Sequence, residues 1–284
     1  MRVEAWASAC SFHIDGRSAL KVAPRGAVDF PSEESYIGGP GIIPDKPLED
    51  PLTHTLIGVL HELGRLGTAQ NRKVYARHGV GPNMFGVSYA NLERLKKTLG
   101  VNHDLARGLW ASANHDARIL ATKIADPARV SSRDLDSWVK DLDNYVISDA
   151  FSELGARTPW ARKKMEAWGA ARGEWIGRVG WLLLARLARS DSSLTDEELI
   201  EKLATIEREI HTRKNRTRDA MNSALIAIGM RNSGLKAAAL SAAKRIGKVE
   251  VDHGQTSCKT PDAAEYILRA AGRRRTPRGA ASRP

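Results

Sequence analysis

Residues Trp138 to Trp181 decide how this chain folds. They read Trp138-Val-Lys-Asp-Leu-Asp-Asn-Tyr145-Val-Ile-Ser-Asp149, then Thr158-Pro159-Trp160, and then Trp175-Ile-Gly-Arg178-Val-Gly-Trp181. Five of the seven tryptophans fall in this segment, on helical stretches that also carry acids and arginines. Aromatic faces, a carboxylate and guanidinium groups on successive helices suit contact with a nucleic-acid backbone and stabilisation of positive charge. A buried core would explain the tryptophans alone, but it gives no reason for Asp149 and Arg178 to lie among them.

Helical spacing continues on both sides of this segment, from Thr53 to about Lys248. Apolar residues recur at helical intervals, as at Leu92, Leu95 and Leu99. The pattern predicts helices over residues 102–112, 114–125, 131–140, 143–155, 158–168, 173–189, 195–210, 214–230 and 233–246. No strand-like alternation interrupts them, and short turns between helices of this length are typical of stacked antiparallel pairs. The predicted fold class is therefore all-α, an α-solenoid of HEAT-like antiparallel helix pairs.

Local signals place several of the helix boundaries. Asp126-Pro127 predicts a helix end, because the residue before a proline is pushed out of the α region. Ser131 and Asp134 form a capping-box pattern, and Thr158-Pro159 predicts a cap followed by a first-turn proline. The acids that follow Thr195 face the positive end of a helix dipole, which predicts a helix start there.

The chain divides into three predicted regions. Residues 1–50 are rich in glycines and prolines that break helices, and they predict a flexible N-terminal arm. Residues 51–250 form the predicted HEAT-like repeat domain. Residues 251–284 are predicted to be a polar tail with a short helix from Asp262 to Ala271, capped by Thr260 with Pro261 in its first turn, and then a disordered arginine-rich end.

The net charge of +11 indicates a polyanionic partner. The tail from Arg269 onward holds six arginines and no acid, so six of those eleven charges belong to it and +5 remains for the rest. The body of the chain therefore needs a local basic face. The best candidate is a basic run at a predicted helix start. Positive charge at this end opposes the helix dipole, and contact with a phosphate would explain why it is there. Its members are Arg213, Lys214, Arg216 and Arg218.

Several functional classes are not favoured. Cys10 and Cys258 lie at opposite ends and provide neither a disulfide framework nor a zinc spacing. His61-Glu62 lacks the second histidine of a metalloprotease motif. The start lacks the apolar run of a secretory signal, and Arg186 interrupts the most apolar segment, so no membrane span is expected. We expect a cytoplasmic monomer that uses no metal and no other cofactor.

The chain resembles the DNA alkylation repair family, the AlkD-like HEAT-repeat DNA glycosylases, over about residues 55 to 248. The order and spacing of the following segments carry the resemblance: Asn71-Arg72, Phe85-Gly86-Val87, Leu109-Trp110, His115-Asp-Ala-Arg118, Leu120-Ala121, Ile124-Ala-Asp-Pro127, Trp138 to Asp149, Trp175-Ile-Gly-Arg178 and Ala227-Ile-Gly-Met230. The segment from Val251 to Pro261 is also similar to a tail in some family members.

The resemblance implies a curved solenoid whose concave, positively charged groove wraps duplex DNA. It also implies hydrolysis of the N-glycosidic bond of cationic N-alkylated purines, such as 7-methylguanine and 3-methyladenine. The family's functional centre is an aspartate flanked by aromatic side chains, with an arginine on a later helix. Asp149, Tyr145 and Arg178 match these catalytic positions, with Tyr145 in place of a tryptophan. A second tryptophan follows an Ala-Ile-Gly run, which here ends in Met230, so one aromatic wall is missing.

The chemistry of such a lesion fits a site centred on a carboxylate. An alkylated purine already carries positive charge and leaves readily, so the barrier lies in the oxocarbenium-like sugar. A carboxylate beside that sugar stabilises the developing charge and positions water. A tyrosine face adds cation–π attraction of about 0.5–2 kcal/mol.

The spacing of Tyr145 and Asp149 supports this assignment. They are four residues apart and so share one helix face. A shift of register would select Asp143 or Asp141, but neither has an aromatic residue four positions earlier.

Most tryptophans have a simpler interpretation than contact with a nucleic acid. Those predicted to pack in the core or between helices are Trp110, Trp138, Trp160, Trp168 and Trp181. Trp175, one turn from Arg178, and Met230 join the basic run as candidate DNA contacts, although Met230 also fits a core position. His115, Asp116 and His253 have no partner pattern and are predicted to be structural or exposed.

Three functions remain open from the residues alone. The first is a DNA glycosylase acting on alkylated purines in duplex DNA, with Asp149 as the carboxylate. The second is a non-catalytic HEAT-like scaffold that binds DNA or RNA, which the methionine at position 230 favours. The third is a protein-interaction solenoid, which only a neutral concave face would favour.

Overall fold

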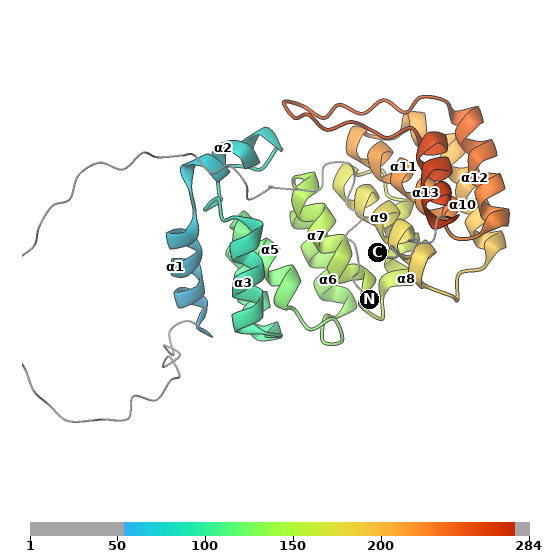
Figure 1. The fold of residues 1–284 in the computed structure, drawn as a ribbon. Helices are drawn as coiled ribbons and strands as arrows, with labels where there is room; N and C mark the ends of the chain where they lie inside the picture. Colours follow the sequence, from blue (N-terminus) through green and yellow to red (C-terminus); the bar gives the residue numbers. More distant parts are fainter. Residues whose placement is uncertain (1–53, 276–284) are drawn as a thin grey trace, which may run out of the picture.

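Thirteen α-helices follow one another in the computed structural model, which describes residues 54–275 (Figure 1). They are α1 (Leu56–Leu66), α2 (Ala69–Arg77), α3 (Tyr89–Leu99), α4 (His103–Ala111), α5 (His115–Ile124), α6 (Ser132–Trp138), α7 (Tyr145–Ala156), α8 (Ala161–Gly169), α9 (Glu174–Ser190), α10 (Asp196–Glu209), α11 (Asn215–Gly229), α12 (Ser233–Ile246) and α13 (Ala263–Arg275). Short 3-10 helices, η2 (Val139–Asp141) and η3 (Ile210–Thr212), follow α6 and α10. Residues 54–275 contain no strand, which confirms the all-α prediction. The predicted arm, residues 1–50, lies outside the described residues.

Side-chain caps start most of these helices. Ser131 and Asp134 form a reciprocal capping box at α6, and Thr195 and Glu198 form another at α10. The side chain of Asn144 accepts a hydrogen bond from the amide of Ile147 at 3.1 Å and so starts α7. Because each cap satisfies an amide that the helix itself leaves unpaired, the sequence sets these starting points locally.

Two predicted boundaries are wrong. The hydroxyl of Thr158 donates to the carbonyl of Gly155 at 2.8 Å, so Thr158 closes α7, and α8 begins only at Ala161. The carboxylate of Asp262 accepts a hydrogen bond from the amide of Glu265 at 2.8 Å, so Asp262 starts α13 in place of Thr260. The helix α13 also continues to Arg275, through three arginines for which the sequence predicts disorder.

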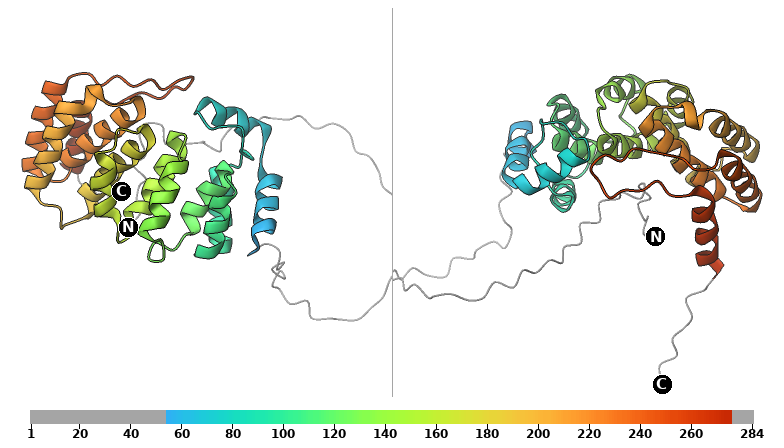
Figure 2. Two further views of the ribbon diagram at one scale, coloured as in Figure 1. Left: turned by 180° about the vertical axis from the view of Figure 1, so that it is seen from behind. Right: turned by 90° about the horizontal axis from the view of Figure 1, so that it is seen from above.

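The helices form a curved row of pairs. Seen from above, the row follows an arc, and the segment of residues 247–262 between α12 and α13 runs back along it toward α2 (Figure 2). Within the described residues, no helix is both long and apolar enough to cross a membrane.

Alternate helices of the row run parallel. Near the starts of α9 and α11, Thr217 donates to the carbonyl of Glu174 at 2.9 Å, and near their ends Arg231 donates to the carbonyl of Ala188 at 2.8 Å. In the same way Arg157, at the end of α7, donates at 3.1 Å to the carbonyl of Thr122 near the end of α5. The first turns of α5, α7, α9 and α11 therefore lie along one edge of the layer, which we call the N-terminal edge.

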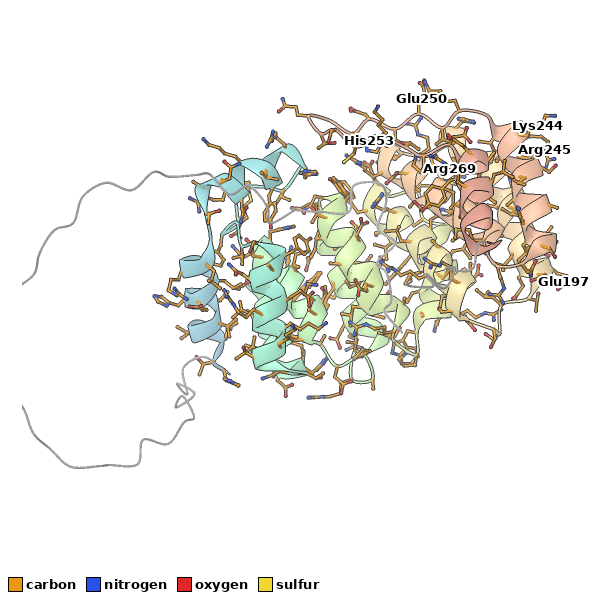
Figure 3. All side chains as sticks on the ribbon, viewed as in Figure 1. Glu197, Lys244, Arg245, Glu250, His253 and Arg269 are labelled. Atoms are coloured by element: carbon orange, nitrogen blue, oxygen red, sulfur yellow. The ribbon has the colours of Figure 1, made fainter. Side chains whose placement is uncertain are left out.

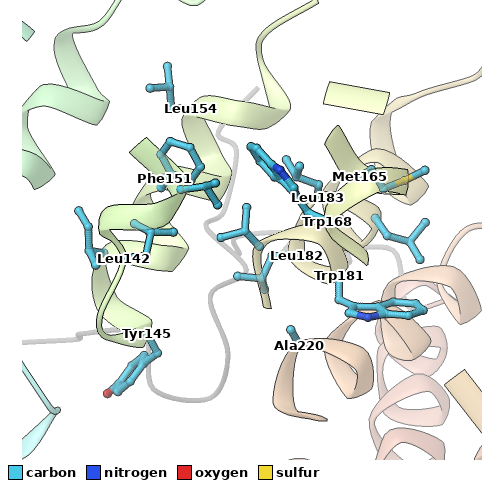
Figure 4. Close-up of a cluster of buried hydrophobic side chains, with 14 of the residues drawn as sticks. Leu142, Tyr145, Phe151, Leu154, Met165, Trp168, Trp181, Leu182, Leu183 and Ala220 are labelled. Carbon is cyan, nitrogen blue, oxygen red and sulfur yellow. The ribbon is translucent and has the colours of Figure 1, made fainter. Parts of the chain in front are cut away.

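Aromatic side chains pack against one another across the helices α4, α6, α7 and α8. The rings of Trp110 and Trp138 stack with their centroids 4.6 Å apart, and Phe151 follows at 5.7 Å from Trp110. Trp168 lies 5.9 Å from Phe151, packed beside Leu182 and Leu183 of α9 (Figure 4). Trp110, Trp138, Trp168 and Trp181 are all buried, which confirms that they belong to the core. Trp160 is half-buried and donates from its indole to the carbonyl of Val130 at 3.0 Å.

A buried carboxylate holds the turn between α2 and α3. Asp116 is fully buried at the start of α5, and its oxygens accept hydrogen bonds from three consecutive amides at 2.7, 3.0 and 2.9 Å. These amides belong to Phe85, Gly86 and Val87. Gly86 has φ of +79°, and an added Cβ would lie 2.7 Å from the carbonyl oxygen of Thr68, so only glycine fits there. The chain therefore reverses at this point because Asp116 and Gly86 act together.

The substitution Asp116→Ala should strongly destabilise the fold. It leaves three buried amides without an acceptor, and each such group costs about 1–3 kcal/mol. We expect the free energy of unfolding in urea to fall by about 3 kcal/mol or more. The control is Asp104→Ala, whose carboxylate is 74 % exposed and pairs only with exposed Arg129. That control should lose no more than about 0.5 kcal/mol, and an equal loss in both variants would contradict the role of Asp116.

Candidate functional site

Arg178 lies at the centre of a buried charge cluster that joins three helices. Its side chain, on α9, is completely buried. Nη2 and Nε donate to Oδ1 of Asp149 on α7, at 2.7 and 3.2 Å. Nη1 donates to Oδ2 of Asp219 on α11 at 2.7 Å and to the carbonyl of Arg216 at 2.9 Å. The two acids and one backbone carbonyl thus satisfy the guanidinium from two neighbouring helices.

The three charges of this cluster are not equally accessible. Asp219 is buried, whereas the side chain of Asp149 is 21 % exposed. The second carboxylate oxygen of Asp149, Oδ2, receives no hydrogen bond from the residues that the structure describes. Asp149 therefore presents one oxygen at the N-terminal edge, while Asp219 faces inward and serves only the arginine.

Burial and pairing act against each other on these groups. Burial raises the pKa of Asp149, and the neighbouring charge of Arg178 opposes that shift. Burial by itself would lower the pKa of Arg178, but Asp149 and Asp219 raise it well above the ordinary arginine value. Arg178 therefore remains a cation, and its charge keeps two carboxylates close together.

Tyr145 lies beside this cluster in the first turn of α7. The Cζ atom of Arg216 lies 4.4 Å from the centroid of its ring, and that of Arg178 lies 5.7 Å away. The tyrosine hydroxyl shares a hydrogen bond with Nδ1 of His78, just after α2. Burial raises the pKa of Tyr145 to about 12, so the hydroxyl stays protonated. In Figure 4 its ring lies apart from the Phe151 and Trp168 cluster, with the hydroxyl directed away from it.

Arg216 links the cluster to the segment 247–262. Its Nη1 atom lies 3.3 Å from Nδ1 of His253, and the other ring nitrogen of His253 lies 2.9 Å from the hydroxyl of Thr260. The backbone amide of Arg216 donates to a carboxylate oxygen of Glu174 at 2.7 Å. Figure 3 shows His253 on this segment. The prediction that His253 is structural or exposed misses this contact.

The four predicted basic contacts have different surroundings. Lys214 is exposed, and Arg216 and Arg218 are partly exposed at the start of α11. The Nε atom of Arg218 is buried and has no hydrogen-bond partner among the described residues. Arg213 is buried instead, where it donates to the carbonyl of Ala171 at 3.1 Å and to that of Gly169. The guanidinium of Arg213 therefore caps the end of α8, and we do not include it among the cations of the outer surface.

Met230 does not lie beside Asp149. It follows α11, whose first turn holds Arg216, so about 21 Å of helix separates Met230 from Arg216 at 1.5 Å per residue. The prediction that Met230 replaces an aromatic wall of the site is therefore wrong. Trp175 lies in the first turn of α9, at the N-terminal edge, and is half-buried against the core.

The choice of Asp149 over its neighbours agrees with the geometry. The carboxylate of Asp141 accepts a hydrogen bond from the indole of Trp110 at 2.8 Å and pairs with Arg118 at 3.3 Å. The carboxylate of Asp143 accepts from the side chain of Asn144 at 2.7 Å. Neither acid contacts Arg178 in the described structure. The structure brings Tyr145, Asp149 and Arg178 together as predicted.

Sequence reasoning missed three residues of this cluster. Asp219 is a single acid one turn after Arg216, and its inward helical position was the signal that could have identified it. His78 and Glu174 reach the cluster from α2 and α9, and no spacing in the sequence links them to α11. Among the described residues no group of three His, Cys, Asp or Glu side chains could hold a metal ion.

Comparisons with known proteins match this architecture. The model of the family described as DNA alkylation repair enzyme matches residues 59–267. A solved structure described as "A new family of proteins related to the HEAT-like repeat DNA glycosylases with affinity for branched DNA structures" has a TM-score of 0.70 and 28% sequence identity. That match covers 78% of this chain and 95% of the solved chain.

Two bacterial relatives are similar over most of their length. The uncharacterized protein Lin0241 of Listeria innocua is 27% identical over 223 residues, covering 75% of this chain and 95% of the relative. The uncharacterized protein Lmo0209 of Listeria monocytogenes is 26% identical over the same length and coverage.

A curved row of antiparallel helix pairs is the architecture of a HEAT-like repeat protein. The chain belongs to the DNA alkylation repair enzyme family. This confirms the resemblance that the sequence indicates.

The substitution Arg178→Gln should destabilise the protein more at pH 7 than at pH 5. Removing one partner of a buried ion pair typically costs about 3–5 kcal/mol. Without the arginine, burial and the neighbouring charge of Asp219 raise the pKa of Asp149 further above its unfolded value. A group with a raised folded pKa destabilises the fold as pH rises through that pKa, so protonation at lower pH should recover part of the loss.

Urea unfolding at both pH values measures this difference. The control is Arg172→Gln, because Arg172 is 72 % exposed and lies 3.8 Å from Glu209. It should change the free energy of unfolding by less than about 1 kcal/mol. An equal loss for Arg178→Gln at pH 5 and pH 7 would show that repulsion between the two acids is not the cause.

Proposed function

We propose that this protein binds DNA along the N-terminal edge. The observation that carries the proposal is that the first turns of α5, α7, α9 and α11 lie on one edge together with exposed cations. A helix start carries a positive partial charge of about half an elementary charge, and parallel helices bring several such charges to the same side. This arrangement favours a polyanion over a neutral or cationic partner.

Basic side chains extend this edge in two directions. On α11, Lys214, Arg216 and Arg218 face the outer surface at least in part. On α2, Lys73 and Arg77 are exposed, and His78 connects the end of this helix to Tyr145. The N-cap residues of α9 and α11 make no side-chain cap, and although the amide of Arg216 is bonded to Glu174, the start of α9 has no side-chain cap among the described residues and suits phosphate oxygens.

The affinity of the solved relative for branched DNA supports a more specific proposal. We propose that this protein prefers branched or interrupted duplexes to a continuous duplex of the same length. The curved row of helices and the segment 247–262 suit a bent backbone, because bending exposes phosphates to more of the protein surface.

Neutralising the N-terminal edge should weaken DNA binding at every sequence. The substitutions Lys214→Ala and Arg77→Ala each remove one cation, so each should reduce the slope of log affinity against log salt by about 1. The control is Lys97→Ala, because Lys97 is exposed in the last turn of α3, at the opposite edge. Fluorescence anisotropy with a four-way junction and a linear duplex measures both affinity and salt slope. If Lys97→Ala lowers the slope as much as the other two variants, the N-terminal edge is not the contact surface.

A second candidate function is DNA glycosylase activity. Asp149 favours it, because one carboxylate oxygen of this side chain is unpaired within the described structure and partly exposed. Such an oxygen can stabilise an oxocarbenium-like sugar after a cationic 7-methylguanine or 3-methyladenine begins to leave. The reaction is hydrolysis: the glycosidic bond breaks, its electrons leave with the purine, and water adds to the sugar carbon and releases a proton.

Two contacts favour binding without chemistry. Arg178 shares the charge of Asp149, which weakens the field that the carboxylate can apply to a sugar. Arg216 covers the ring of Tyr145 at 4.4 Å, so a cationic base can reach that ring only after Arg216 moves. We therefore place DNA binding first and base excision second.

The substitution Asp149→Asn separates the two candidates. It keeps the size of the side chain and removes its negative charge, and loss of such a preorganised group typically costs about 10²–10³ in rate. Release of 7-methylguanine from methylated duplex DNA should fall by that factor, while DNA affinity stays level or rises. Asp104→Asn is the control, since Asp104 is exposed and remote in the chain from the cluster. Absence of base release by the unmodified protein would exclude the glycosylase candidate and leave the binding proposal standing.

A further inference from the structure

The segment 247–262 is fastened to α11 by side-chain amides. The amide nitrogen of Asn215 donates to the carbonyl of Asp252 at 2.7 Å, and the amide oxygen of Asn215 accepts from the backbone of Asp252 at 2.7 Å. Further along α11, Asn222 donates to the carbonyl of Pro261 at 3.0 Å. The reciprocal pair brings the next residue of the segment, His253, beside the residue that follows Asn215 on α11.

That residue is Arg216, whose backbone is held on both sides while its side chain is free to turn. Its amide donates to Glu174 at 2.7 Å, and its carbonyl accepts from Nη1 of Arg178 at 2.9 Å. Its guanidinium lies over the ring of Tyr145 and against His253. Arg216 forms no ion pair with a carboxylate among the described residues, so only neutral groups hold the guanidinium where it is.

The contact with Arg216 fixes which nitrogen of His253 carries the proton. An arginine side chain only donates hydrogen bonds, so Nδ1 of His253 is the acceptor, at 3.3 Å. The proton is then on Nε2, which donates to the hydroxyl of Thr260 at 2.9 Å. Gly254 follows with φ of +61°, and Thr256 donates to the carbonyl of His253 at 2.9 Å, so a tight turn holds the ring in place.

We propose that His253 holds the side chain of Arg216 in a closed position over Tyr145, and that DNA binds after Arg216 leaves this position. The inference rests on the proposed DNA binding and adds the regulation of that site. In the closed position the guanidinium covers Tyr145, which lies one turn before Asp149 on α7. In the open position it contacts a phosphate at the N-terminal edge, and the ring of Tyr145 is uncovered.

A DNA phosphate is a stronger partner for Arg216 than the groups of the closed position. A phosphate is negatively charged and pairs with a guanidinium through two parallel hydrogen bonds, whereas the imidazole and the tyrosine ring are neutral. The closed position therefore persists without DNA and opens in its presence. The apparent affinity for DNA is reduced by the fraction of molecules in which Arg216 is closed.

The substitution His253→Ala should increase the affinity for DNA at pH 8. It removes the acceptor that holds Arg216, and the loss of one such hydrogen bond corresponds to about three- to tenfold in the dissociation constant. Fluorescence anisotropy with the four-way junction measures this gain. His61→Ala is the matched control, because His61 is an exposed histidine on α1, and it should leave the affinity unchanged. Direct contact of His253 with DNA predicts the opposite sign.

The gain should depend on Arg216. In an Arg216→Ala background, His253→Ala should change the affinity by less than about twofold, because there is no guanidinium left to hold. Arg216→Ala alone should weaken binding and reduce the slope of log affinity against log salt by about 1, since one phosphate contact is lost. An equal gain from His253→Ala with and without Arg216 shows that the histidine acts through another group, and it overturns the inference.

The pH dependence of binding provides a second readout. The charged groups that face His253 are Arg216 and Asp219 on α11, Arg178 on α9 and the adjacent Asp252. Burial and the two arginines lower the pKa of His253, and the two acids oppose that shift. When Arg216 leaves, one of these arginines is gone, so the pKa of His253 rises and DNA binding takes up a proton. Affinity therefore rises as pH falls below the ordinary histidine value of about 6.5.

The substitution His253→Asn isolates this proton. An asparagine oxygen accepts from Arg216 much as Nδ1 does, but it does not titrate. Between pH 8 and pH 5.5 the unmodified protein should gain about three- to tenfold more affinity than His253→Asn. His78, which bonds to Tyr145, titrates in both proteins and cancels from this difference. Thermal melting at both pH values confirms that each variant is folded, and the asparagine variant decides the question if His253→Ala does not fold.

The outcomes separate the inference from its basis. An unchanged or lower affinity of His253→Ala at pH 8 overturns the inference and leaves the proposed DNA binding in place. Equal pH dependence of the unmodified protein and His253→Asn does the same. If neither the unmodified protein nor any variant binds the junction, the proposed function fails and the inference fails with it.

Discussion

Withdrawing Arg178 from water is the step on which the rest of this structure depends. A guanidinium without its hydration is stable only when acceptors surround it in the right geometry, and here Asp149 on α7 and Asp219 on α11 supply the charge. The pairing therefore holds α7, α9 and α11 in one register. Gly180 has a related role, since a Cβ there would lie 2.1 Å from the amide nitrogen of Gly169 and would push α8 away from α9. The position of α9 therefore depends both on its close packing against α8 at Gly180 and on the hydrogen bonds of Arg178.

The parallel direction of alternate helices gives this packing an electrostatic consequence. Because α5, α7, α9 and α11 all begin at one edge, their dipoles add there instead of cancelling. Lys214, Arg216 and the cations of α2 then extend the positive edge. Within it, Asp149 is the partner of Arg178 that is partly exposed, and its charge is shared with that arginine. A site of this kind is organised to hold a polyanion first. Chemistry at Asp149 requires that Arg216 give access to the ring of Tyr145.

The family to which this chain belongs is compatible with both candidate functions and does not decide between them. Its relatives in Listeria have no described activity, and the solved relative is described by its affinity for branched DNA. Tyr145, where the family resemblance expects a tryptophan, gives a physical reason for a change of role. Its hydroxyl bonds to His78, and Arg216 lies over its ring, so the aromatic face is part of a network and not an open wall. A tryptophan has no hydroxyl to bond in this way, and the network would differ with it.

Periodicity and capping residues were sufficient to predict the helices. The Ser131 capping box and the helix start after Thr195 lie where the pattern predicts them, and nine helices from α4 to α12 begin and end within about three residues of the predicted bounds. Thr158 was misassigned because a threonine can close one helix as well as start the next, and here its hydroxyl donates to the carbonyl of Gly155 in the last turn of α7. The burial of four tryptophans could be predicted from their size, but their stacking order, with Trp110 against Trp138, could not.

The sequence by itself determined the all-α class, most of the helix boundaries and the pairing of Tyr145 with Asp149 on one helix face, because spacing within a helix is a local property. Only the tertiary structure decided that Asp219 shares Arg178, that Arg213 is buried against α8, and that Met230 lies a whole helix away from Asp149. Each of these outcomes depends on how one helix packs against another, and residues far apart in the chain carry no common period. The packing of the helices determines which charged groups keep their contact with water, and therefore which charges a partner can reach.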